Sequence, residues 1–176
     1  IFDLGEGDGV AVCVAEIDPI LTSLGLGSYV LDLGCGPGRL LAPLAQAHPR
    51  VTFTGLDIRF YDHHGIRERN IGWMVGDGRT IPYADATLDV VYSVALLQHL
   101  PHDAVIGYIG EIARCLKPGG KARLQHVIGT EDSFLSHQIG ERQLEDWCSE
   151  AGLLVWPADV GRVHHQWVWV TAESPA

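Results

Sequence analysis

Three glycines separated by single residues follow an acidic residue in the stretch VLDLGCGPGRL, which covers residues 30–40. A backbone without side chains lets a bound molecule approach the main chain closely. Dinucleotide-binding turns space their glycines as Gly-x-Gly-x-x-Gly, whereas here the third glycine comes one residue earlier. The acidic residue, Asp32, would repel a pyrophosphate but can accept hydrogen bonds from an ammonium group. The pattern therefore favours a zwitterionic ligand that carries an amino acid over a diphosphate.

Short apolar runs rich in β-branched residues alternate with helix-like segments along the chain. Such runs are typical of strands buried on both faces of a parallel sheet. After the last helix, two strand-like runs are joined by a short loop, so they must pair antiparallel. We therefore predict an α/β fold, a three-layer sandwich with a mostly parallel seven-stranded sheet that ends in an antiparallel hairpin. The expected strands are 29–33, 51–58, 71–76, 88–94, 121–128, 153–156 and 163–172, and the expected helices are 38–47, 102–116 and 141–151.

The front of the chain is predicted to be helical. The stretch DPILTSLGLG is typical of a helix that Asp18 caps and Pro19 begins, whereas VAVCV, at 10–14, fits a helix or a strand. We therefore expect a helical segment over residues 1–28, followed by one ligand-binding domain over residues 29–176. A chain of 176 residues is long enough for a single domain with a sizeable core.

Composition narrows the classes of partner. The net charge is −10 and no basic stripe occurs, which argues against nucleic acid, because phosphate binding depends on Lys and Arg. No apolar stretch approaches the length that spans a membrane. Four scattered cysteines without a Cys-x-x-Cys pair indicate reduced thiols, so we expect a cytoplasmic protein that binds no nucleic acid and no membrane.

The glycine-rich stretch, in this order with TGLDIR, GDGRTIPYADATLDVVYS, LKPGG and LEDWCSEAGL, resembles class I S-adenosylmethionine-dependent methyltransferases. The likeness extends from about Tyr29 to the C-terminus, and it implies a Rossmann-like fold with S-adenosylmethionine as cofactor. In that family Asp57 would hold both ribose hydroxyls, Asp77 would face the adenine edge, and the Ser93 carbonyl would contact the ligand's amino group. The cofactor-binding residues that the resemblance implies are Asp32, Gly34, Cys35, Gly36, Gly38, Asp57, Ile58, Asp77, Gly78 and Ser93.

A small-molecule methyl acceptor is expected, because two family signatures for nucleic-acid bases are absent. No Asn/Asp-Pro-Pro-Tyr/Phe sequence follows the fourth strand, and no Pro-Cys nucleophile is present. The acceptor should arrive over the carboxyl ends of the fourth and fifth strands. His99 is therefore the first candidate for a catalytic base and His137 the second, although His99 fits a turn-packing role equally well and His137 fits an exposed loop. His126 is expected to be a hydrogen-bonded residue of the fifth strand.

Other parts of the sequence could suggest different sites or functions. We predict no metal site: Asp62, His63 and His64 suit the polar start of a helix, and adjacent histidines in a strand, His164 and His165, point to opposite faces. A different function, a non-catalytic S-adenosylmethionine-binding regulatory or partner subunit, fits the same cofactor residues. A dehydrogenase would need the glycine spacing that this chain lacks. The sequence leaves open whether the protein forms a homodimer.

Overall fold

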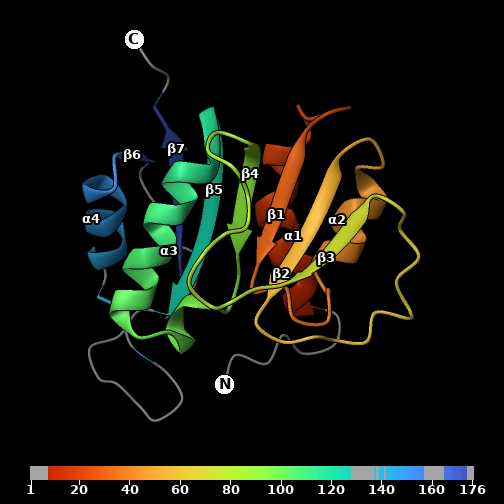
Figure 1. The fold of residues 1–176 in the computed structure, drawn as a ribbon, viewed down its shortest axis with the longest axis horizontal. Helices are drawn as coiled ribbons and strands as arrows, with labels where there is room; N and C mark the ends of the chain where they lie inside the picture. The colour runs from red at the N-terminus through yellow and green to blue at the C-terminus, as the bar shows by residue number, and fades with distance from the viewer. Residues whose placement is uncertain (1–7, 128–136, 138, 141, 157–164, 174–176) are drawn as a thin grey trace.

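The computed structural model describes residues 8–127, 137, 139–140, 142–156 and 165–173. Its sheet has seven strands in the order β3-β2-β1-β4-β5-β7-β6 (Figure 1). Strands β1 to β5 are parallel, and β7 runs antiparallel to both of its neighbours, which confirms the predicted sheet and hairpin. The strands are β1 Tyr29–Leu33, β2 Thr52–Asp57, β3 Ile71–Val75, β4 Leu88–Ser93, β5 Leu116–Val127, β6 Leu153–Trp156 and β7 His165–Ala172.

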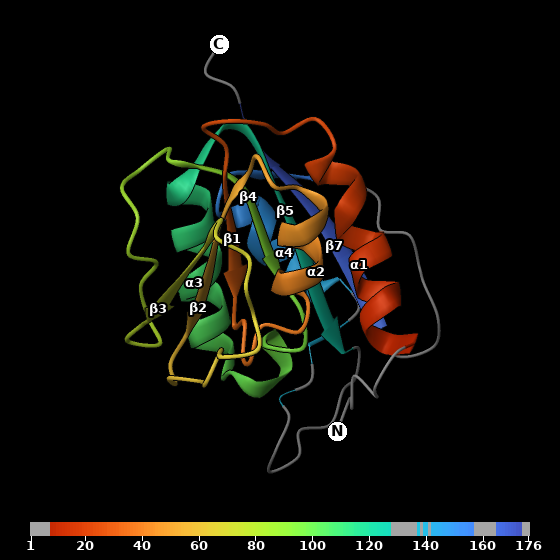
Figure 2. The ribbon, with the colours of Figure 1, turned by 90° about the vertical axis from the view of Figure 1, so that its right-hand side faces the viewer.

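Helices cover both faces of the sheet and complete the three layers (Figure 2). Helices α1 (Asp8–Leu21) and α2 (Leu41–Ala47) lie on one face, and α3 (His102–Cys115) and α4 (Gln143–Glu150) lie on the other. Alternate strand residues point to opposite faces, so β1 places Val30 in one apolar cluster and Leu31 in the other. This is why the central strands are apolar throughout rather than alternating with polar residues.

Residues 8–21 form one helix, which corrects the predicted capping by Asp18. Helix α1 includes Pro19 in its last turn, and Asp18 lies inside the helix, where its carboxylate pairs with Nε2 of His48 at 2.8 Å. The helix continues past Asp18 because one apolar stripe, from Cys13 through Ile17 to Leu21, is buried against the sheet. Helix α1 therefore shares a hydrophobic core with β1 and α2.

Two element boundaries also differ from the predictions. Helix α2 begins at Leu41 rather than at residue 38, because Gly38 has φ +83°, which an α-helix cannot contain. Strand β5 begins at Leu116 and so includes the KPGG stretch, which lies between the predicted helix over 102–116 and the predicted strand over 121–128. There the pairing with β4 shifts from Leu88–Leu116 to Val90–Lys121, so the extra residues are taken up as a bulge.

The crossovers on either side of β3 are irregular. Within the described residues, no helix occurs over 58–70 or over 76–87. The expectation that Asp62, His63 and His64 begin a helix is therefore wrong. Instead, the Asp62 carboxylate accepts a hydrogen bond from the backbone N–H of His64 at 3.0 Å, which forms a local turn.

Candidate functional site

The glycine turn after β1 folds against the end of β2. The backbone N–H groups of Gly34 and Cys35 donate to the Leu56 carbonyl oxygen at 2.8 and 3.2 Å. One carboxylate oxygen of Asp57 accepts the Gly36 N–H at 2.9 Å, and the other accepts the Arg59 N–H at 3.0 Å. The structure thus joins the two sequence motifs, because the turn and the acidic residue at the end of β2 are hydrogen-bonded to each other.

The three glycines of the turn differ in what surrounds them. All have positive φ, at +80° for Gly34, +51° for Gly36 and +83° for Gly38. A Cβ on Gly34 would lie 2.9 Å from the side chain of Leu96, and one on Gly38 would lie 2.5 Å from Trp73. A Cβ on Gly36 would find nothing within 4 Å. The sequence suggested that all three clear space for a ligand, but only Gly36 borders open space; protein side chains occupy the space at the other two.

Asp32 is a buried carboxylate with only 3% of its surface exposed. It lies in β1 between Gly55 of β2 and Tyr92 of β4. Its pKa is raised to about 8, chiefly by burial and also by the charge of Asp57, while the Tyr92 side chain opposes the rise. The ionised form is costly here unless a cation approaches it, so the surroundings of Asp32 suit an ammonium ligand.

The thiol of Cys35 is held in its protonated form. Burial raises its pKa, and the nearby charges of Asp32 and Asp57 raise it further. A thiol in this state is a poor nucleophile. Cys35 therefore belongs to the turn as a small side chain.

The segment after β3 brings Asp77 and Gly78 to the same end of the sheet. The Asp77 carboxylate accepts the N–H of Arg79 and of Thr80 at 2.8 Å and the Thr80 hydroxyl at 2.9 Å, and these bonds lower its pKa. A Cβ on Gly78 would lie 3.2 Å from Cγ2 of Ile58, whose side chain is 63% exposed. Ile58 and Gly78 therefore lie next to each other, as the resemblance implies.

Strand β4 ends in side-chain contacts rather than in a glycine turn. The buried Ser93 donates its hydroxyl to the Leu33 carbonyl oxygen at 2.9 Å, which ties β4 to β1. Two residues later, the Ala95 N–H donates to Oε1 of Gln125 on β5 at 2.8 Å. The Ser93 hydroxyl is thus used inside the protein, which agrees with a ligand role for its backbone alone.

The two candidate bases, His99 and His137, lie on segments that contact each other in space. His99 is exposed in the short 3-10 helix η1 (Leu97–His99), and the His137 N–H donates to the carbonyl oxygen of Gln98 at 2.6 Å. The half-buried His137 ring lies 6.4 Å from the ring of His102. Residues 128–136, which connect β5 to this point, lie outside the described residues. His126 is fully buried in β5, opposite Gln166 of β7.

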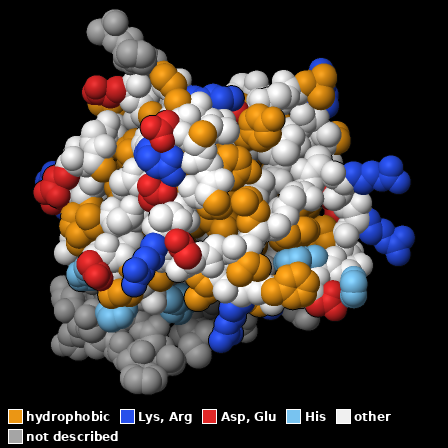
Figure 3. Space-filling model, in the orientation of Figure 1, with side chains coloured by type: hydrophobic (Ala, Val, Ile, Leu, Met, Phe, Trp, Pro, Cys, Tyr) orange, Lys and Arg blue, Asp and Glu red, His pale blue; other side chains and the backbone are white. Residues whose placement is uncertain are grey.

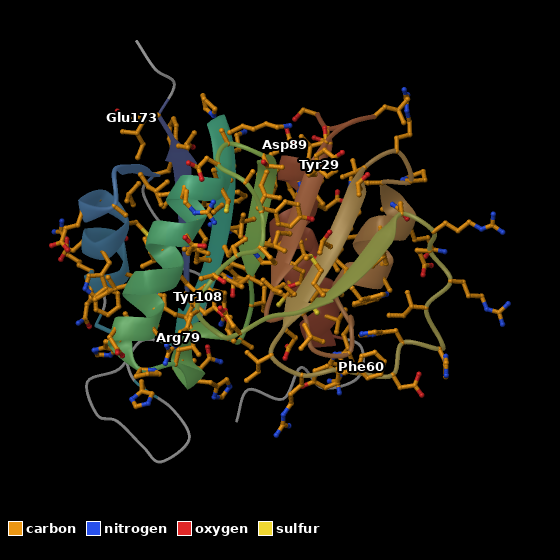
Figure 4. The ribbon with its side chains drawn as sticks, viewed as in Figure 1. Tyr29, Phe60, Arg79, Asp89, Tyr108 and Glu173 are labelled. Carbon is orange, nitrogen blue, oxygen red and sulfur yellow. The ribbon has the colours of Figure 1, made fainter. Side chains whose placement is uncertain are left out.

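Sequence reasoning missed two features of α3. The Arg114 guanidinium binds both carboxylate oxygens of Glu111 at 2.8 Å and donates to the carbonyl oxygens of Ile81 and Tyr83. The Glu111–Arg114 spacing of three residues was the available signal. Tyr108 is buried, and its pKa is raised first by that burial and then by the charges of Asp77 and Asp57. Figure 4 shows Tyr108, Arg79 and Phe60 toward one end of the sheet, and Tyr29 and Asp89 toward the other.

The described residues contain no group of three side chains suited to a metal ion. His63 stacks on Trp73 with ring centroids 3.5 Å apart, and His64 forms only a local pair with Asp62 at 3.6 Å. His164 and the side chain of His165 lie outside the described residues. On the face shown in Figure 3, basic and acidic side chains are interspersed. Among the described helices, none has the length and apolarity to cross a bilayer.

Comparisons with known proteins identify the family of this chain. Residues 30–120 match the model of the family described as "Methyltransferase domain". An uncharacterized methyltransferase of Mycobacteroides abscessus is 26% identical over 85% of this chain and 71% of its own length. Trans-aconitate 2-methyltransferase of an Azoarcus species is 34% identical over 68% of this chain and 46% of its own.

Among solved structures, magnesium protoporphyrin IX methyltransferase of Synechocystis, with bound S-adenosylhomocysteine, superposes with a TM-score of 0.76. The alignment covers 97% of this chain and 91% of that chain at 17% identity, so it supports the Rossmann-like fold. The family match covers the glycine turn, Asp57, Asp77 and Ser93 together. The chain therefore belongs to the methyltransferase domain family, as a class I S-adenosylmethionine-dependent methyltransferase.

Proposed function

We propose that this protein binds S-adenosylmethionine at the carboxyl ends of β1, β2 and β4. It then transfers the methyl group to a small-molecule acceptor that arrives over the carboxyl ends of β4 and β5. The observation that carries the proposal is the direct hydrogen bond between Asp57 and the Gly36 N–H, with the buried Asp32 on the strand before. Two carboxylates of different character thus lie beside one open turn. Asp32 suits the ammonium group of an amino acid, and Asp57 suits a pair of hydroxyls.

The residues of the site fit this cofactor. Gly36 borders open space that a Cβ would fill, which leaves room for a ligand against the backbone. Each Asp57 oxygen accepts one backbone hydrogen bond and has a lone pair left for a ribose hydroxyl. We assign the adenine to the neighbouring Ile58 and Gly78, with Asp77 at its edge. The backbone of Gly34, Cys35, Gly38 and Ser93 completes the proposed binding set.

The bound cofactor supplies a methyl group on a sulfonium centre, ready for an in-line displacement. The task of the chain is to align the acceptor and to exclude water. The η1 helix lies on the acceptor side, because it follows the end of β4 at Ser93. When the acceptor atom loses a proton, His99 takes it, with His137 as the second candidate.

Two further features bear on the acceptor. The net charge of −10 disfavours a polyanionic partner such as nucleic acid. The names of the relatives include trans-aconitate 2-methyltransferase and fatty-acid O-methyltransferase, which supports a small acid as the acceptor. We also propose that residues 29–176 form the methyltransferase domain and that a helical segment precedes it. We propose a cytoplasmic location for the protein. A homodimer stays a prediction that a solution mass measurement checks.

Calorimetric titration tests cofactor binding first. We expect S-adenosylhomocysteine to bind and NAD not to bind. The Asp57→Ala variant should lose about 100-fold in affinity, because two charge-assisted hydrogen bonds to the ribose disappear. The matched control is Asp62→Ala, which removes an exposed carboxylate five residues further along. Equal affinities for both variants would contradict the role of Asp57.

Label transfer tests turnover. The protein is incubated with methyl-labelled cofactor and a panel of small carboxylic acids, alcohols and amines, followed by a metabolite extract. Transfer that Asp57→Ala abolishes supports the enzyme. Tight cofactor binding without transfer to any acceptor would instead support the non-catalytic subunit.

A further inference from the structure

A groove lies between the end of α1 and the β5–β7–β6 part of the sheet, separate from the proposed methyl-transfer site. Its volume is about 390 Å³, which is within the usual range for small-molecule pockets. We call it the hairpin groove. It is lined by Pro19, Ile20, Lys121, Trp156, Trp169 and Thr171. A neighbouring hollow of about 160 Å³ shares Ile20 and Lys121 with it and extends to Asp89, at the opposite end of β4 from the site (Figure 4).

The aromatic walls of the hairpin groove are held in place by specific contacts. Nε1 of Trp156 donates to the hydroxyl of Thr171 at 2.8 Å. The buried guanidinium of Arg123 stacks on Trp169 at 4.0 Å from the ring centroid and is itself bound by Glu16 of α1. Both indoles are therefore fixed in the absence of any ligand. Although this hydrogen bond holds Trp156 in place, 56% of its surface stays exposed, which is a large apolar area.

The charge at the groove is positive in an acidic protein. Lys117 and Lys121 are the only lysines in the sequence, and both line the neighbouring hollow. Lys117 pairs with Asp89 at 2.8 Å. Lys121 is exposed and forms no ion pair with any residue that the structure describes. Its ammonium group is thus available to an anion whose apolar part occupies the hairpin groove.

We propose that the hairpin groove binds an amphiphilic monocarboxylate, a molecule with one carboxylate and an apolar body. The carboxylate pairs with Lys121, and the apolar body lies against Trp156, Trp169 and Ile20. The apolar walls supply affinity through burial, and the single cation selects an acid over a neutral molecule. This site is independent of the proposed methyl transfer.

Titration with octanoate in the presence of saturating S-adenosylhomocysteine tests the proposal. We expect saturable binding with a Kd below about 1 mM and much weaker binding of 1-octanol. Lys121→Gln should raise the octanoate Kd about fivefold, the scale of an exposed ion pair. Trp156→Ala should raise it about tenfold, because an aromatic wall is lost. Both variants should bind S-adenosylhomocysteine as the unaltered protein does.

Two matched variants serve as controls. Lys117→Gln removes the other lysine, and Leu154→Ala removes an exposed apolar residue of β6 that does not line the groove; both should bind octanoate normally. Trp156→Phe keeps a ring at the position if the alanine variant does not fold. The proposal is overturned if octanoate does not saturate, or if the controls weaken binding as much as the test variants. It is also overturned if light scattering shows a dimer that Trp156→Ala disperses, since the groove then holds a second copy.

Discussion

The carboxyl ends of β1 and β2 are built differently from those of β4 and β5. At β1 and β2, backbone N–H groups of one short turn contact the neighbouring strand end, as Gly36 does with Asp57. At β4 and β5, the contacts join residues far apart in the sequence, such as Ala95 with Gln125 and Gln98 with His137. The first end is thus one short turn closed against β2, which we propose as the cofactor site. The second is assembled from separate segments of the chain, which we propose as the acceptor site.

Substitutions in the glycine turn should have the largest effect on stability. Gly38→Ala should lower the free energy of unfolding by about 3 kcal/mol, because the new Cβ meets Trp73 and the residue must keep φ +83°. Gly36→Ala should lower it by only about 1 kcal/mol, because it meets no neighbour. Urea unfolding of both variants measures the two losses.

The same pair of variants separates packing from ligand space. If the room beside Gly36 belongs to the cofactor, Gly36→Ala should reduce S-adenosylhomocysteine affinity at least about tenfold despite its mild effect on stability. A Gly36 variant with unchanged affinity would show that this glycine serves only the backbone conformation.

His99 tests the acceptor end. His99→Ala should lower turnover about 100-fold on the first acceptor identified and leave cofactor affinity unchanged, because a general base acts on the acceptor alone. Steady-state kinetics and calorimetry measure the two quantities. His64→Ala is the matched control, since that exposed ring lies on the irregular crossover after β2. A variant that fails to fold would return His99 to a turn-packing role.

Arg114 of α3 anchors the segment between β3 and β4. Arg114→Met should lower the free energy of unfolding by about 2 kcal/mol, because the carbonyl oxygens of Ile81 and Tyr83 lose their donor. Hydrogen exchange should rise over residues 76–87, and S-adenosylhomocysteine affinity should fall by a few-fold as Asp77 becomes less constrained. The exposed Arg50→Met variant should change neither quantity. Unaltered exchange over 76–87 would rule out this anchoring role.

The sequence predicted most of the sheet because its strands are apolar on both faces and its turns carry glycine. It predicted the cofactor end for the same reason, since the turn and Asp57 are each recognisable within a few residues. The sequence did not predict the anchoring by Arg114, because its partners are carbonyl oxygens about 30 residues away along the chain. The sequence did not predict the bulge in β5 either. A Pro-Gly-Gly stretch predicts a loop, and only pairing with β4 makes it part of a strand.

Asp32 gives the sharpest test of the cofactor end. Its pKa of about 8 means that it carries a proton at pH 7 in the free protein. An ammonium partner lowers that pKa, so binding releases a proton. The affinity for S-adenosylhomocysteine should therefore rise with pH below about 8, by at most about tenfold for each pH unit. Calorimetry in buffers with different ionisation enthalpies counts the proton released.

Asp32→Asn is the matched variant because it keeps the shape and cannot ionise. Its binding should release no proton and should be weaker, with little dependence on pH. Its stability gives a second readout. In the unaltered protein the folded pKa lies above the unfolded value of 3.8, so the folded state holds an extra proton between pH about 4 and 8. Unfolding free energy should fall as pH rises through that range, and the variant should lack this decline. Proton release that persists in Asp32→Asn would assign the titration to another group and leave the ammonium contact of Asp32 without support.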